Sequence, residues 1–394
     1  MIAWAAAMIV RQFLKWVKTA PATERADATG ALARAYLHSE LSPEDRRAAE
    51  AALLLLLDDP SPLVRLALAQ TLASHRQAPI GVMLALAAEP GEIGELVLAR
   101  SPVLSVGELV EVVGEGDGWR QAAIASREMV PAPVAAAIAE VGGANACLTL
   151  IENEGSDVPG FALGRIVSRF GHLPALREAL LRRDGLPAEA HQALIRSVAD
   201  TLSAFVVQKE WLPPEQAARL TKEACEKATV AIAQDLAHER PAEDVRSFVE
   251  HLRAKGELTS ALVLRSLLSG HVRLFFEAVS LLSGLPTAKV AALAADRTGS
   301  AFRALYDRAG LPRGAFVAFR TALEVVQKAS YVDAGADALH EPPGLKRRIV
   351  ERVLEQHRNM PAGGEIDHIL NQLRRWQAEA ARDEARALEG GLAA

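Results

Sequence analysis

Apolar residues recur along almost the whole chain at the spacing of short amphipathic helices. No run of residues alternates convincingly between apolar and polar, as a half-buried strand does. Clusters rich in proline or glycine interrupt the helical segments, as in "DDPSP" (58–62), "EPGE" (89–92), "GEGDG" (114–118) and "VGGAN" (141–145). The pattern therefore predicts an all-α protein of short helices joined by tight corners.

A repeat of 26 residues runs through part of the first half of the chain. Apolar residues follow this step at Leu72, Leu98, Ile124 and Leu150, and expected helix starts follow it at Pro79, Ser105, Pro131 and Asp157. A unit of this length holds two helices of about ten residues and two corners. One such hairpin cannot bury its apolar face alone, whereas stacked neighbours can. We therefore expect an α-α superhelix (solenoid) of short two-helix repeats.

The stretch "DPSPLVR" carries a family resemblance. Its Asp59, Val64 and Arg65 resemble the HEAT-repeat signature, in which an aspartate lies at the corner within a repeat and valine and arginine open the second helix. Similarity extends through "LVLARSPVLS" (96–105), "QAAIASRE" (121–128), "LLRRDGLPAEAHQALI" (180–195) and "ALYDRAGLP" (304–312). Roughly residues 10–320 resemble an uncharacterised bacterial family of HEAT-like helical-repeat proteins, typical of alphaproteobacteria. The resemblance implies a HEAT-like fold and a domain of unknown function, and it transfers no catalytic residue.

Changes in pattern divide the chain into four parts. We expect an N-terminal amphipathic capping helix in 1–20, the HEAT-like α-solenoid in 21–212, a second all-helical lobe in 213–330 and C-terminal amphipathic helices in 331–394. The second lobe begins at a proline pair, and Gly256 and Gly270 break its helices. The last part reads as a helical hairpin with apolar stripes, which either packs on the second lobe or pairs with a second copy in a homodimer.

The segment "DDPSPLVR" also raises a chemical alternative. Asp58 and Asp59 beside Arg65 form either a catalytic carboxylate pair or the corner between two helices. At a corner, Asp59 accepts backbone N–H bonds at a helix start, and Arg65 bridges to a neighbouring carboxylate. The repeat register favours Asp59 as a structural corner residue.

Four arginines and one tryptophan are the candidate partner-binding residues. Arg100, Arg120 and Arg127 lie near equivalent points of successive repeats, as do Arg65 and Arg76, so stacking could line them along one face. Trp119 lies at a repeat corner, where it is either core or partner-facing. Such a strip suits an acidic partner or a phosphate backbone. The alternative is that these arginines are solvated and pair with Glu92, Glu95 and Glu128, and that Trp119 belongs to the core.

Composition narrows the function classes. The net charge of −5 lacks the basic excess of a dedicated nucleic-acid binder. Cys147 and Cys225 are typical of reduced thiols in a cytoplasmic protein, and no His or Cys spacing indicates a metal site. The apolar run at the N-terminus stops at Val10, short of the ~20 residues that span a bilayer. We expect no cofactor, no metal and no enzymatic activity.

The sequence thus favours a non-enzymatic α-solenoid that acts as a protein-protein interaction scaffold or regulatory adaptor. The repeat register and the lack of a catalytic constellation support this hypothesis. Two alternatives stay open. One is a nucleic-acid-binding HEAT-like protein, and the other is a peripheral membrane-surface regulator that uses the N-terminal helix.

Overall fold

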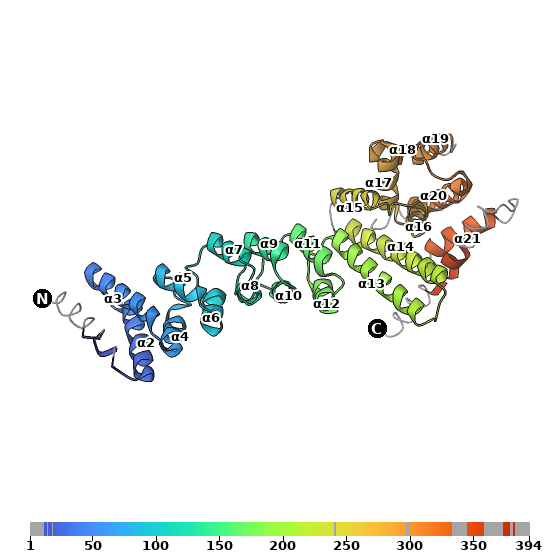
Figure 1. The fold of residues 1–394 in the computed structure, drawn as a ribbon. Helices are drawn as coiled ribbons and strands as arrows, with labels where there is room; N and C mark the ends of the chain where they lie inside the picture. Colours follow the sequence, from blue (N-terminus) through green and yellow to red (C-terminus); the bar gives the residue numbers. More distant parts are fainter. Residues whose placement is uncertain are drawn as a thin grey trace, which may run out of the picture. The chain divides into compact units, whose positions relative to one another are not determined.

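The computed structural model describes residues 12, 13, 15–17, 19–239, 242–296, 299–332, 345–357, 373–378 and 381–382. These residues are mostly helical and form no strand; Val130 and Ser156 make an isolated parallel bridge (Figure 1). The prediction of an all-α protein is confirmed. The chain divides into two compact units, Met1–Leu194 and Ile195–Ala394, within helix α13 (Ala188–Gln208). The sequence pattern predicts this boundary between 212 and 213, in the turn after that helix.

Unit 1 consists of short helices. They are α2 (Ala22–His38), α3 (Pro43–Leu55), the 3-10 turn η1 (Leu56–Asp58), α4 (Pro62–Leu72), α5 (Ile80–Ala88), α6 (Glu92–Arg100), α7 (Val106–Gly114), α8 (Gly118–Ala125), α9 (Ala132–Val141), α10 (Ala144–Glu152), α11 (Gly160–Phe170) and α12 (Pro174–Arg182). From α2 to α12, each even-numbered helix packs against the next even-numbered one. Among the odd-numbered helices, α3 packs on α5, α7 on α9 and α9 on α11. Unit 1 therefore has an even-numbered and an odd-numbered layer of helices (Figure 1).

Residues that are 26 positions apart occupy equivalent positions in this packing. The apolar residues Leu72, Leu98, Ile124 and Leu150 are all 0% exposed. The expected helix starts Pro79, Ser105 and Pro131 are the N-cap residues of α5, α7 and α9. The fourth expected start, Asp157, is wrong, because the N-cap of α11 is Pro159. The backbone N–H of Asp157 instead donates to the carbonyl of Val130 in the isolated bridge, which delays the helix.

Unit 2 contains longer helices and an aromatic core. After α13 follow α14 (Pro214–Glu239), α15 (Ala242–Ala254), α16 (Ser260–Leu268), α17 (Val272–Ser283), α18 (Thr287–Ala294), α19 (Ser300–Arg308), the turn η2 (Arg313–Ala315), α20 (Phe316–Val332) and α21 (Leu345–His357). Phe302, Tyr306, Phe316 and Phe319 contact one another edge-on or stacked. Gly256 and Gly270 have positive φ of 71° and 83°, which explains why glycine ends the helices there.

The apolar stripe of α21 is buried within unit 2. Leu345, Ile349, Val350 and Val353 are each at most 6% exposed, and α21 packs on α20 and α16. The stripe therefore packs on the second lobe, which is one of the two possibilities left open by the sequence. Most of the expected capping helix in 1–20 and most of the last helix in 331–394 lie outside the described residues.

No single helix in the described ranges is long and apolar enough to cross a membrane. By length and composition alone, α17 and α18 taken together pass the same test, although the pair is bent by 109°.

Candidate interaction surfaces

Asp59 lies in the corner between η1 and α4 and is 8% exposed. Its carboxylate accepts two hydrogen bonds from the guanidinium of Arg25, both 2.8 Å long, and one from the backbone N–H of Ser61 at 2.8 Å. The bonds from Arg25 hold the pKa of Asp59 below its ordinary value. The neighbouring Asp58 is exposed. The corner therefore orders one carboxylate in an ion pair and leaves the other in solvent.

Arg65 and Arg120 connect carboxylates to backbone carbonyls. Arg65 pairs with Glu89 at 2.8 Å and donates to the carbonyl of Asp59 at 2.6 Å. Arg120 pairs with Glu115 at 2.6 Å and donates to the carbonyl of Ala88, at the end of α5, at 3.0 Å. Glu89 and Glu115 are not among Glu92, Glu95 and Glu128, which are the partners expected from the sequence.

Arg127 binds the end of the preceding helix of its layer. Its two terminal nitrogens donate to the carbonyls of Leu98, at 2.6 Å, and Ser101, at 2.7 Å. The last carbonyls of a helix lack partners within the helix, so this guanidinium, which follows α8, acts as a cap for the end of α6. Burial lowers the pKa of Arg127, and the group still carries its charge at neutral pH.

Two further residues repeat this capping along unit 1. Asn153, one 26-residue step after Arg127, donates its amide to the carbonyls of Ala125 and Arg127 at 2.8 and 2.7 Å. Arg183 donates to the carbonyls of Ile151 at 2.7 Å and Ser156 at 2.6 Å. Arg127 is a candidate from the sequence for another reason, whereas Asn153 and Arg183 are not predicted from it. Their position after the ends of α10 and α12 is the signal that identifies them.

Arg100 and Trp119 differ in exposure. Arg100 is the last residue of α6 and is exposed. Trp119 is half-buried, contacts the core of unit 1 and packs on Gly94 of α6, where an added Cβ would lie 2.9 Å from the ring. The guanidinium of Arg120 lies 5.2 Å from the ring of Trp119. The structure thus brings Trp119 and Arg120 together, and Arg127 binds the helix that carries Arg100.

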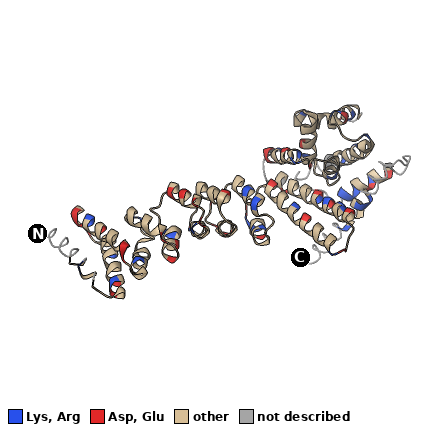
Figure 2. Ribbon diagram, viewed as in Figure 1, with Lys and Arg blue, Asp and Glu red and all other residues tan. Residues whose placement is uncertain are grey.

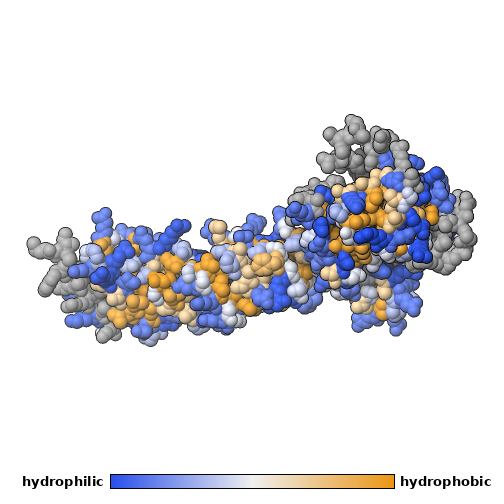
Figure 3. All heavy atoms as spheres, turned by 90° about the horizontal axis from the view of Figure 1, so that it is seen from above, coloured by the Kyte–Doolittle hydropathy of each residue, from blue (hydrophilic) through white to orange (hydrophobic). Residues whose placement is uncertain are grey.

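The odd-numbered helices of unit 1 expose large apolar side chains, which we call the apolar strip. It comprises Leu54 and Leu55 of α3, Ile80 and Leu84 of α5, Val106 of α7, Val141 of α9 and Phe161 of α11. Exposure ranges from 41% for Leu84 to 73% for Phe161. Figure 3, which looks onto this layer, shows a band of apolar residues over unit 1. The sequence signal is the near-complete apolar character of "IGVMLALAA" in α5, because such a helix is apolar on all its faces.

A second apolar surface lies in unit 2 between α13 and α14, and we call it the α13–α14 groove. Its lining includes Ile195, Val198, Leu202 and Val206 of α13 and Ala217, Leu220 and Cys225 of α14. Leu202 is 57% exposed, and Trp211 in the connecting turn is 67% exposed. From Ile195 onward, α13 contains no buried residue. An apolar helix face is therefore left open to solvent.

Comparison with known proteins identifies the family. The family model DUF2336, described as an uncharacterised protein conserved in bacteria, matches residues 93–361, which is more than half of the chain. The chain belongs to the DUF2336 family. No curated protein and no solved structure matches it. The match covers residues 93–361, whereas the resemblance noted from the sequence covers roughly residues 10–320. The matched region therefore begins after the "DPSPLVR" corner and extends further toward the C-terminus.

The described part of this DUF2336 protein brings no three His, Cys, Asp or Glu side chains together as a metal site. Its two cysteines are free and differ in access. Cys147 is buried, and burial raises the pKa of its thiol to about 11. Cys225 is partly exposed in the α13–α14 groove, and burial also raises its pKa. The reactivity of Cys147 therefore reports on the core of unit 1, and the reactivity of Cys225 reports on the α13–α14 groove.

Proposed function

We propose that this DUF2336 protein is a non-enzymatic interaction scaffold whose unit 1 is a HEAT-like α-solenoid that binds a protein partner. Two features support the solenoid: the two-layer packing of α2 to α12, and the full burial of apolar residues at a 26-residue step. A third feature is the capping by Arg127, Asn153 and Arg183. Each of these residues follows one even-numbered helix and donates to carbonyls at the end of the even-numbered helix before it.

The apolar strip carries the proposal for a protein partner. Large apolar side chains that gather on one layer of a repeat protein are typical of an interaction surface. By contrast, Arg65, Arg120 and Arg127 already bind carboxylates or helix ends, which reduces the charge available to a phosphate backbone. Both signs of charge are present along unit 1 (Figure 2). A folded protein or an amphipathic segment with its own apolar face is the ligand that fits.

Charge substitutions in the strip test the proposal. Leu84→Glu and Phe161→Glu place a carboxylate in the strip, whereas Leu181→Glu changes a leucine on α12 of the other layer whose exposure of 47% is close to the 41% of Leu84. Wild type and variants are used to capture proteins from a lysate of the source bacterium, and each captured protein is quantified by mass spectrometry. We expect one partner to be lost with both strip variants and retained with Leu181→Glu.

The captured partner is then purified and titrated against each variant. The proposal is contradicted if the strip variants bind it as tightly as the wild type does. It is also contradicted if Leu181→Glu loses the partner to the same extent, because the loss then reflects general surface charge. Circular dichroism of each variant ensures that a folded protein is compared.

The α13–α14 groove favours a second function, which is self-association. Two helices that share one apolar face form a four-helix bundle when they meet the same face of a second copy. The helices that line the groove carry both signs of charge, for example Asp200 on α13 and Arg219 on α14. A self-complementary interface requires such a mixture, because each patch meets its own copy. We propose a second copy of this chain as the occupant of the groove.

A further inference from the structure

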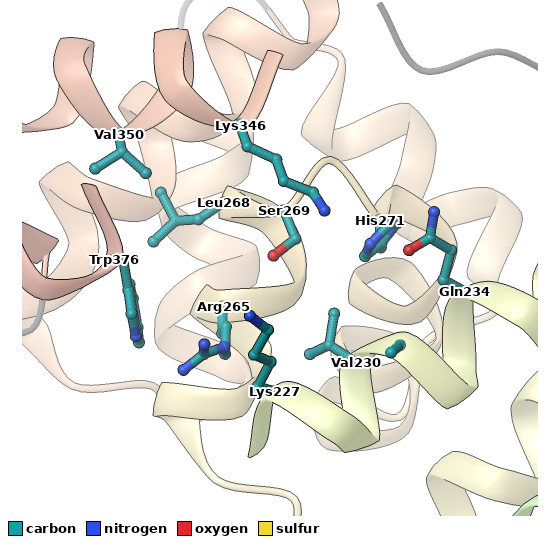
Figure 4. A pocket seen from close by; sticks show the side chains of 11 residues that line it. Lys227, Val230, Gln234, Arg265, Leu268, Ser269, His271, Lys346, Val350 and Trp376 are labelled. Carbon is teal, nitrogen blue, oxygen red and sulfur yellow. The ribbon is translucent and has the colours of Figure 1, made fainter. Parts of the chain in front are cut away.

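Unit 2 contains a basic cavity formed by α14, α16, α21 and the residue that precedes α17 (Figure 4). Its volume is about 90 Å³. Lys227, Arg265, Lys346 and His271 contribute to its lining, together with the polar side chains of Ser269 and Gln234. Among the described residues, no aspartate or glutamate lines this cavity. Cationic groups from three helices therefore converge on one small space.

Arg265 is the most buried of these cations. It is 6% exposed, and its guanidinium lies 5.3 Å from the ring of Trp376, which is 8% exposed. A buried cation is costly unless negative charge compensates it. Burial raises the pKa of the Glu226 carboxyl on α14, whereas the nearby charges of Lys222 and Arg265 act to lower it.

The lysines complete the cavity from two sides. Lys346, in the first turn of α21, extends its amine toward Ser269 and His271, and Lys227 extends its amine from α14 toward the region of Arg265 and Ser269 (Figure 4). Lys346 is half-buried and Lys227 is exposed. The start of α21 adds two further arginines, at 347 and 348, in a helix rich in positive charge (Figure 2). The cavity thus combines a buried guanidinium with ammonium groups near its opening.

We propose that this cavity binds a small tetrahedral oxyanion, namely inorganic phosphate or the phosphoryl group of a phosphate monoester. Arginine donates several N–H groups in a planar arrangement that suits phosphate oxygens, and lysine adds a point charge. The hydroxyl of Ser269 and the amide of Gln234 offer neutral donors at the same place. The volume of about 90 Å³ admits one compact oxyanion and leaves the rest of a larger ester outside. The site is independent of the apolar strip and of the α13–α14 groove.

Calorimetric titration of the full chain with inorganic phosphate, at constant ionic strength, tests the site. We expect the wild type to bind and Lys227→Met and Lys346→Met each to bind about tenfold more weakly, since each loses a charge-assisted contact. Lys289→Met is the matched control, because Lys289 on α18 is exposed and does not line the cavity. Glu226→Gln removes a nearby carboxyl that interacts electrostatically with Arg265, so it should bind phosphate at least as tightly as the wild type does.

The proposal is overturned if the wild type does not bind phosphate, or if Lys289→Met weakens binding as much as the two cavity variants do. Circular dichroism of each variant checks that it is folded, and Lys227→Met should leave the core of unit 2 intact because Lys227 is exposed. A second titration uses vesicles that contain phosphatidic acid. Binding to these vesicles without binding of inorganic phosphate also overturns the assignment, because the ligand is then a membrane surface. Binding of glycerol phosphate with the same variant pattern supports the recognition of a phosphoryl group.

Discussion

Asp59 illustrates how a single side chain stabilises a corner between helices. It accepts from Arg25 on α2 and from the backbone of Ser61 at the start of α4, so it ties two helices together. We expect Asp59→Ala to lower the free energy of unfolding by ~0.5–2 kcal/mol, because it removes the hydrogen bonds from Arg25 and from the backbone of Ser61. Asp58→Ala, at the exposed neighbouring position, should change it by less than ~0.5 kcal/mol. Urea denaturation followed by circular dichroism measures both.

The stabilisation by Asp59 should depend on pH. Its pKa in the folded protein is lowered, chiefly by the hydrogen bonds from Arg25, from an ordinary value of 3.8. The stabilisation is therefore present above that value and is lost as the pH falls through the lower pKa of the folded state. The difference in stability between wild type and Asp59→Ala should be full at pH 7 and shrink below pH ~4. A difference that does not change over this range contradicts the ion-pair explanation.

At the scale of helices, hydrogen bonds to the end of a neighbouring helix distinguish structural arginines from exposed ones. Arg127 donates to two carbonyls near the end of α6, whereas Arg100 on that same helix is exposed. Hydrogen bonds from a charged donor contribute ~1–3 kcal/mol, so we expect Arg127→Met to lower the stability of unit 1 by that amount. Arg100→Met removes the same charge and should have an effect of less than ~0.5 kcal/mol.

Chemical denaturation gives the size of the effect of Arg127→Met, and hydrogen exchange locates it. Amides near the end of α6 should exchange faster in this variant, since the helix end loses its cap. If Arg127→Met and Arg100→Met lower the free energy of unfolding equally, the capping hydrogen bonds add no stability beyond the effect of removing a positive charge.

The predictable part of this fold is the part that repeats locally. Leu98 and Ile124 share a register, so their burial and the helix ends near them follow from the sequence. The ion pair of Arg25 with Asp59 joins residues 34 positions apart and has no counterpart at the 26-residue step, so no periodicity reveals it. The basic cavity depends still more on tertiary packing.

The residues of that cavity are far apart in the chain. Lys227, Arg265 and Lys346 come from three separate helices and follow no motif. The sequence gives no sign of their convergence, because the packing of α14 and α21 against α16 brings them together. The apolar strip is hidden for a different reason. The sequence of an all-apolar helix such as α5 does not show which of its faces is open to solvent.

At the scale of the whole molecule, self-association through the α13–α14 groove is testable by oligomeric state. Leu202→Glu places a charge in the groove, whereas Ala204→Glu places it on the same helix at an exposed position outside the lining. We expect light scattering after size exclusion to find a dimer for the wild type and for Ala204→Glu, and a monomer for Leu202→Glu. The burial of an apolar face drives this association, and an unpaired carboxylate in that face opposes it.

The two cysteines provide an independent readout of the same prediction. Cys225 lines the groove, so a dimer should protect it from alkylation, and Leu202→Glu should restore its reactivity. Cys147 is buried with a thiol pKa of about 11, so it should react only on unfolding and serves as an internal control for the fold. Both thiols are alkylated at fixed pH, because the reactive form is the thiolate. A wild-type protein that is monomeric and reacts at Cys225 as fast as Leu202→Glu does would rule out the groove as a contact between copies.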